Sequence, residues 1–414
     1  MTGTSIMRHR DFRRYWFGVV LSEIGTRGTV AAVLYHVYLL TGSTVQVGLV
    51  GLAQAVALLG ISPLGGAIAD RMDRRRLLQI SQSLSLLASA TLAALTVIDV
   101  IEVWHILLAM LINTAAGSFE RPARDALIPS LVPRTELVRA FALINPSREL
   151  AILLGPAIAG VLIAWAGPEA MYVLDVLSYV AIIVILAFIR TPPMVPDAVR
   201  PNLWASIGEG IAFVRARPLI LQLMSLDLSA TVFGAYRVIL PALATDILLV
   251  GASGYGLLSA APSAGALVGS AIVYRMMHRA RAGYVVLLAT GAYGSMALAL
   301  AGSAMLSGAV GFAVALAAAG ALGLFDAMAT TVRHAAVQLE TPDEIRGRVS
   351  SVYQMASRGG PSLGQLNIGW LSGLLGPAGA LAAGSLVPMV LAAGLAVTGG
   401  RIRDYRTEDA ATAG

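Results

Sequence analysis

The sequence predicts an all-α integral membrane protein whose twelve transmembrane helices form two pseudo-symmetric six-helix bundles. Of the 414 residues, 57% are hydrophobic and only 13% are charged, whereas soluble domains carry about a quarter charged residues. The mean hydropathy is +0.77. Long apolar runs reach the roughly 20 residues that a helix needs to cross a bilayer, and arginine occurs in every second loop. Lipid is therefore the expected solvent for most of the chain.

The twelve apolar runs follow one another along the chain with short polar interruptions. The first follows the basic segment MRHRDFRRYW and lacks a small-residue cleavage site, which predicts an uncleaved span and not a signal peptide. The predicted spans are 15–40, 43–69, 77–98, 103–128, 137–165, 168–190, 218–248, 253–275, 283–303, 306–335, 346–373 and 377–399.

The arginine distribution predicts the orientation of these spans. If the N-terminus is cytoplasmic, every inner segment carries arginine and none of the six outer turns does. This agrees with the positive-inside rule, so we expect a multi-pass protein of the cell membrane with both termini in the cytoplasm. The rule also accounts for the net charge of +6, so no nucleic-acid partner is expected.

The composition excludes several kinds of chemistry. All 29 basic residues are arginine, so there is neither a Walker-A lysine nor a Schiff base, and the absence of cysteine excludes thiolate chemistry. The five histidines lack metal-ligand spacing. The segment GPSLG (360–364) fits G-x-S-x-G, but it lies in an apolar helix, where small residues favour helix packing. We expect no metal, no cofactor and no enzymatic activity.

A polar interruption at 191–217 divides the chain. Its three early prolines predict an extended linker, and the apolar residues that follow predict a short helix at the cytoplasmic interface. The predicted parts are an N-terminal bundle, a cytoplasmic linker and a C-terminal bundle with a short cytoplasmic tail, at 1–190, 191–217 and 218–414.

The two halves repeat one another at a nearly constant offset of 204 to 206 residues. Such a parallel repeat is typical of transporters whose substrate site lies between the halves near the bilayer midplane. The matching pairs include Glu23 with Asp227, GSFE (117–120) with GLFD (323–326), and GPAIAG (155–160) with GPSLGQ (360–365).

Several motifs resemble the major facilitator superfamily. GGAIADRMDRRRLL (65–78) resembles the loop between helices 2 and 3 of that family through Gly66, Asp70, Arg71, Arg74 and Arg75, with Asp73 where the family usually has glycine. LLGPAIAGVL resembles the helix-5 motif of drug/proton antiporters through Gly155, Pro156 and Gly160. SEIGTRGTVAAVLYHVYLLTGST, FERPARDALIPSLVP and TPDEIRGRVSSVYQ resemble the branch that holds macrolide-efflux and siderophore-export proteins.

The resemblance implies a secondary active transporter. Proton-coupled efflux of an amphipathic drug or siderophore-like molecule, by alternating access and as a monomer, is the leading hypothesis. A proton-coupled importer of a small solute and a non-transporting sensor or assembly protein are the alternatives. The family loop is expected to form a cytoplasmic gate, and Arg74 or Arg75 is expected to reach Asp125 or Glu120. The other expected gate residues are Asp326, Arg346 and Arg348.

Charges inside the predicted spans are the candidate functional residues, because each costs at least about 2.5 kcal/mol at the bilayer centre. Glu23 and Asp227 lie at matching depths in the first helix of each half, as expected of proton carriers or substrate ligands. Alternatively, Arg27 forms a fixed pair with Glu23 one helical turn away. For the remaining candidates a fixed ion pair is likewise the alternative to substrate contact; they are Arg148, Glu149, Asp175, Arg237 and Arg358.

Overall fold

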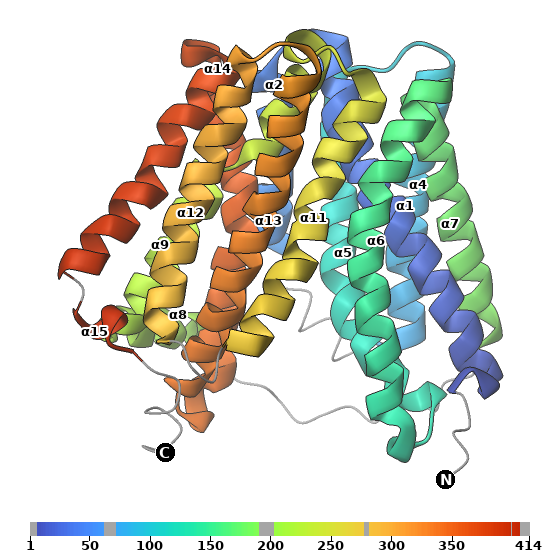
Figure 1. The fold of residues 1–414 in the computed structure, drawn as a ribbon. Helices are drawn as coiled ribbons and strands as arrows, with labels where there is room; N and C mark the ends of the chain where they lie inside the picture. The colour runs from blue at the N-terminus through green and yellow to red at the C-terminus, as the bar shows by residue number, and fades with distance from the viewer. Residues whose placement is uncertain (1–5, 62–71, 190–202, 277–280, 399, 406–414) are drawn as a thin grey trace. The chain divides into compact units, whose positions relative to one another are not determined.

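The computed structural model describes residues 6–61, 72–189, 203–276, 281–398 and 400–405, and most of these are helical (Figure 1). Eleven of the described helices are long and apolar enough to cross a membrane. The last, α14 (Asp343–Thr398), has 56 residues and is interrupted at Gly376, whose φ is 72°. Because Gly376 separates the predicted spans 346–373 and 377–399, α14 contains both. The all-helical membrane fold is confirmed.

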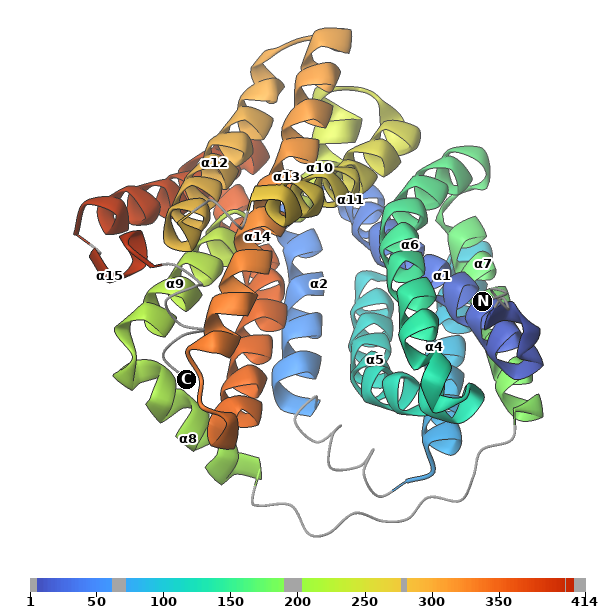
Figure 2. The ribbon, with the colours of Figure 1, turned by 60° about the horizontal axis from the view of Figure 1, so that its bottom comes forward.

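The first of two compact units comprises Met1–Thr41 and Ala53–Val199. In it, α1 packs against α6 and α7, and α4 packs against α5 and α7; α1 and α6 lie side by side in both views (Figures 1 and 2). The helices of this unit are α1 (Arg10–Thr41), α4 (Arg74–Val97), α5 (Val103–Leu131), α6 (Leu137–Ala166) and α7 (Pro168–Phe188).

The second unit comprises Gly42–Leu52 and Arg200–Gly414. In it, α11 packs against α13, α12 against α13 and α14, and α9 against α14. Its main helices are α8 (Leu203–Ala216), α9 (Pro218–Phe233), α11 (Gly251–Met276), α12 (Ala282–Gly302), α13 (Gly308–Leu339) and α14. Helix α8 lies in the segment after the linker prolines, where the sequence predicts a short helix.

Part of α2 (Thr44–Val56) belongs to the second unit, although it precedes most of the first in sequence. A Cβ added to Gly48 would lie 2.8 Å from the carbonyl oxygen of Gln365 and 2.9 Å from Cα of Gly369. The backbones of α2 and α14 therefore approach closely, as small residues allow in membrane helices. The sequence division at residues 191–217 gave no indication of this packing.

Local sequence explains where individual helices begin and end. The Asp73 side chain accepts a hydrogen bond from the backbone N–H of Arg76 at 2.9 Å and so caps the N-terminus of α4. This gives the residue that departs from the family pattern a structural role. Gly167, with φ of 83°, precedes Pro168 between α6 and α7, and Gly376 precedes Pro377 in the same way. Both turns need the positive φ that glycine tolerates.

The sequence repeat reappears as a repeated contact. A Cβ on Gly155 of α6 would lie 2.6 Å from Cβ of Arg27 in α1, and one on Gly360 of α14 would lie 2.5 Å from Oγ1 of Thr231 in α9. Arg27 and Thr231 are 204 residues apart, and the two glycines are 205 apart. Each unit thus packs its glycine-proline helix on the same turn of its first long helix.

Replacing Gly155 with alanine is expected to destabilise the first unit. The new methyl group would also lie 2.8 Å from the backbone nitrogen of Gly28, and overpacking of this kind costs about 1–3 kcal/mol. The measurement is the thermal unfolding midpoint of purified protein. Gly117→Ala is the matched control, because nothing lies within 4 Å of a Cβ there. Equal midpoints for the two variants would contradict the close contact of α1 with α6.

Candidate functional site

A buried ion cluster connects α1 and α5 in the first unit. Nη1 of Arg124 lies 2.7 Å from Oε1 of Glu23, and its Nη2 lies 3.1 Å from Oε2 of Glu120. The side chain of Arg124 is only 5% exposed, and those of Glu23 and Glu120 are 17% and 13% exposed. Two carboxylates therefore share one buried guanidinium group, and the charges of these three residues do not balance.

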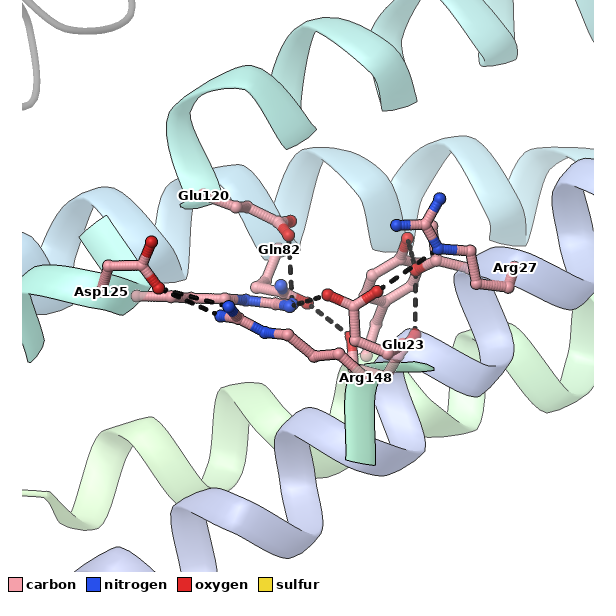
Figure 3. Close-up of polar contacts among 10 residues, drawn as sticks. Glu23, Arg27, Gln82, Glu120, Asp125 and Arg148 are labelled. Atoms are coloured by element: carbon pink, nitrogen blue, oxygen red, sulfur yellow. Dashed lines mark hydrogen bonds and ion pairs between the residues drawn. The ribbon is translucent and has the colours of Figure 1, made fainter. Parts of the chain in front are cut away.

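Arg27 supplies the remaining positive charge from the next turn of α1. Its Nε lies 3.6 Å from Oε2 of Glu23 (Figure 3), and its side chain is 47% exposed. The predicted i,i+4 pair is thus present, but the shorter contact of Glu23 is with Arg124, which sequence reasoning missed. The signal was available, since Arg124 lies one turn after Glu120 inside a predicted span and an arginine there needs a partner.

A second ion pair lies on the same unit. Both terminal nitrogens of Arg148, on α6, lie 3.3 Å from Oδ1 of Asp125 on α5 (Figure 3). The next residue, Glu149, is exposed. Adjacent helical residues point about 100° apart, so these two side chains face different surroundings.

The corresponding pair in the second unit is more deeply buried. Nη2 of Arg333, on α13, lies 2.5 Å from Oδ1 of Asp227 on α9, with side-chain exposures of 1% and 5%. Ser357 of α14 donates to the other carboxylate oxygen at 2.6 Å, and Arg333 also donates to Thr330 at 2.9 Å. The exposed Asp326 accepts from Thr330 at 3.5 Å. Both oxygens of Asp227 are therefore satisfied by fixed partners.

The two units use the repeat differently. Glu23 and Asp227 occupy matching positions, but the place of Arg27 is taken by Thr231 in the second unit. Counted at the 206-residue offset, Arg124 aligns with Thr330, and Arg333 lies one turn further along α13. A strict comparison of the halves therefore does not find Arg333. Residues three apart on a helix share a face, which lets Arg333 take the equivalent role.

The other predicted site residues form no ion pair with these clusters among the described contacts. The Arg237 side chain is exposed, with its guanidinium carbon 6.0 Å from the ring centre of Tyr236. Arg358 of α14 is also exposed. Asp175 of α7 is fully buried. The helix-5 motif residues Gly155, Pro156 and Gly160 are all buried inside α6.

The predicted gate residues are only partly described. Gly66, Asp70 and Arg71 of the family loop lie outside the described residues. Arg74 is the first residue of α4, and Arg75 donates to the carbonyl oxygen of Ala187 at 2.7 Å. Arg346 pairs with Asp343 in the first turn of α14, and Arg348 pairs with Glu209 of α8. Asp125 and Glu120 pair with Arg148 and Arg124 in this structure.

A family comparison matches residues 1–413 to the transmembrane secretion effector family of the major facilitator superfamily. The chain belongs to this family. Its members are membrane transporters and not enzymes. Consistent with this, Ser362 of the G-x-S-x-G match is buried within α14. Within the described residues, no group of three or more His, Asp or Glu side chains is arranged to hold a metal ion.

Curated relatives include enterobactin exporters. The enterobactin exporter EntS of Shigella boydii is 25% identical over 407 residues, which cover 96% of this chain and 94% of that protein. EntS of Salmonella typhimurium is 25% identical over 401 residues with the same coverage. The similarity therefore extends over nearly the whole of both proteins.

Solved structures of several transporters share the fold. The nucleoside transporter NupG matches with a TM-score of 0.74 at 14% identity, covering 96% of this chain and 100% of that one. A bacterial homologue of the human lysosomal transporter Spinster, in an inward-facing and unoccupied conformation, matches with a TM-score of 0.72 at 16% identity, covering 97% and 98%. These identities establish the major facilitator fold alone.

Breaking the buried pair of the second unit is expected to be costly. Arg333→Met leaves Asp227 without its counter-charge, and removing one partner of a buried pair costs about 3–5 kcal/mol. The double variant Asp227→Asn/Arg333→Met removes both charges and should recover part of that loss. A double-mutant cycle on thermal unfolding measures this coupling. The exposed pair of Asp343 and Arg346 is the control, with little coupling expected. Additive effects at Asp227 and Arg333 would contradict a fixed pair.

Proposed function

We propose that this transporter exports an amphipathic small molecule in exchange for protons, by alternating access. Two comparisons support export: the family is described as secretion effectors, and the curated relatives at full length are enterobactin exporters. A siderophore-like or drug-like compound is therefore the proposed substrate class. The arginine distribution supports cytoplasmic termini in a cell membrane, and we propose that the protein works as a monomer.

The observation that carries proton coupling is the charge balance of the first unit. Glu23 and Glu120 contribute two negative charges around the single buried guanidinium of Arg124. The balance is completed by Arg27, which is half-exposed and 3.6 Å from Glu23. A proton on a carboxylate, or a cationic group of the substrate, neutralises the cluster equally well once Arg27 moves away. The proton and the substrate then compete to replace the positive charge of Arg27, as an exchange mechanism requires.

The second unit supports the assignment of coupling to Glu23. Asp227 already has Arg333 and Ser357 as partners for its two oxygens, in a site that is almost closed to solvent. Thr231, at the position of Arg27, offers no exchangeable charge. We therefore assign Asp227 a positioning role in α9, and Glu23 the role of exchanging its partner during the transport cycle.

Transport into inverted membrane vesicles tests the proposal. With an imposed pH gradient, vesicles containing the wild-type protein should accumulate a compound from a panel of drugs and siderophores that includes enterobactin. Glu23→Gln should abolish accumulation driven by the gradient, because the side chain no longer titrates. Asp343→Asn, in an exposed pair, should transport normally.

Other outcomes identify the alternatives. Gradient-driven accumulation in right-side-out vesicles would identify an importer and contradict export. Accumulation that Glu23→Gln leaves unchanged would contradict the coupling role of this carboxylate. Absence of transport for the whole panel would favour a non-transporting sensor or assembly protein.

A further inference from the structure

A second buried carboxyl group, apart from the ion cluster, lies where α1, α4 and α7 pack together. The side chain of Asp175 on α7 is 0% exposed. Its Oδ2 accepts a hydrogen bond from Ser89 of α4 at 2.7 Å, and its Oδ1 has no hydrogen-bond partner among the described residues. No ion pair of the described residues includes Asp175. A carboxylate in this position would keep its negative charge in an apolar interior with hydroxyl groups alone around it.

Hydroxyl groups from three helices lie around the carboxyl group of Asp175. The Thr29 hydroxyl faces Asp175 from α1, and its Oγ1 is a second buried oxygen without a partner. One hydrogen between the two oxygens, from the hydroxyl group or from a protonated carboxyl group, would satisfy both. Glu120 of α5 is the charged group that acts on the site. Tyr179 is the nearest titratable neighbour on α7 itself, and α4 contributes the hydroxyl of Ser89.

The site has room because α1 carries a glycine there. A Cβ added to Gly25 would lie 2.6 Å from Oδ1 of Asp175 and 2.6 Å from Oγ of Ser178. Any side chain at position 25 would therefore displace the carboxyl group from its pocket. The Ser178 hydroxyl donates to the backbone carbonyl of Asp175 at 2.7 Å, which leaves the carboxyl oxygens to Ser89 and Thr29.

A row of polar contacts leads from this carboxyl group toward the ion cluster, and we call it the polar seam. Polar residues recur every three or four positions on α1 and α4, which places them on one face of each helix. Thr26 lies 3.0 Å from the hydroxyl of Tyr179, and Ser22 donates to Gln82 at 3.4 Å. Ser22 directly precedes Glu23. The seam comprises Ser22, Thr26 and Thr29 of α1, Gln82, Ser85 and Ser89 of α4, and Asp175 and Tyr179 of α7.

We propose that Asp175 is a proton-binding site of the first unit, and that the polar seam connects it with Glu23. In the conformation described here the carboxyl group holds its proton, since no counter-charge meets it. Movement of α1 away from α7 opens the pocket to water and lets the proton leave. Use of this proton in transport rests on the proposed exchange mechanism, whereas its presence on Asp175 does not.

Infrared spectroscopy of the purified protein at pH 7 tests the proton directly and needs no substrate. The wild-type spectrum minus that of Asp175→Asn should contain the carbonyl stretch of one protonated carboxyl group. Asp99→Asn is the matched control, because Asp99 is exposed in a turn with φ of 58°, a conformation that asparagine also adopts. That difference spectrum should show an ionised carboxylate. A carboxylate signal from Asp175 as well would overturn the proposal.

A second variant keeps the test decisive if Asp175→Asn does not fold. Ser89→Ala retains the carboxyl group but removes its hydrogen-bond donor, so the protonated carbonyl band should shift to higher frequency. An unchanged spectrum would show that this band does not come from Asp175.

Gradient-driven transport separates the proton site from the exchange mechanism. Asp175→Asn should retain ligand-induced thermal protection and lose accumulation driven by the pH gradient. Unchanged accumulation would overturn the role of this proton in coupling and leave Glu23 as the coupling residue. If the wild-type protein shows no protonated carboxyl band from Asp175 but Glu23→Gln still abolishes gradient-driven accumulation, coupling is assigned to Glu23 alone. The two proposals therefore fail independently.

Discussion

A charge that leaves water must meet an opposite charge or take up a proton, and this constraint governs the interior of both units. The described helices meet it in three ways. Asp227 is neutralised by Arg333 at 2.5 Å and held by Ser357. Glu23 and Glu120 divide the charge of Arg124 and depend on Arg27 for balance. Among the described residues Asp175 has hydroxyl partners only, and a proton is its proposed means of neutralisation.

The internal repeat separates what the scaffold requires from what the site requires. Close packing of Gly155 on α1 and of Gly360 on α9 is the same in both units, because helix approach depends on small residues at fixed positions. The charges placed on that scaffold differ, with Arg27 in one unit and Thr231 in the other. In the proposed mechanism, the second unit keeps its ion pair fixed while the first unit exchanges the partner of Glu23. The asymmetry also includes the arginine partners, Arg124 of α5 and Arg333 of α13, which do not align at the repeat offset.

The sequence predicted features that depend on neighbouring residues or on composition. The spans, the helix after the linker and the matching depths of Glu23 and Asp227 follow from hydropathy and the repeat. The sequence did not predict the side-chain partners. Arg124 is 101 residues from Glu23, and the two meet only because α5 turns that face toward α1. The sequence also did not predict the packing of α2 against α14, because this packing depends on which unit α2 belongs to. Family resemblance indicated transport but carried no information about Arg333.

Helix α1 connects the two proposed proton-binding groups of the first unit because it contributes to the surroundings of both. Glu23 and Arg27 lie on the face that meets Arg124, whereas Gly25 lies against the carboxyl group of Asp175. Glu23 and Gly25 are two residues apart, which corresponds to about 200° of rotation around the helix, so the two faces are nearly opposite. A small rotation or shift of α1 therefore changes the surroundings of Glu23 and of Asp175 together. Loss of the Arg27 contact on one face and opening of the carboxyl pocket on the other then become one movement.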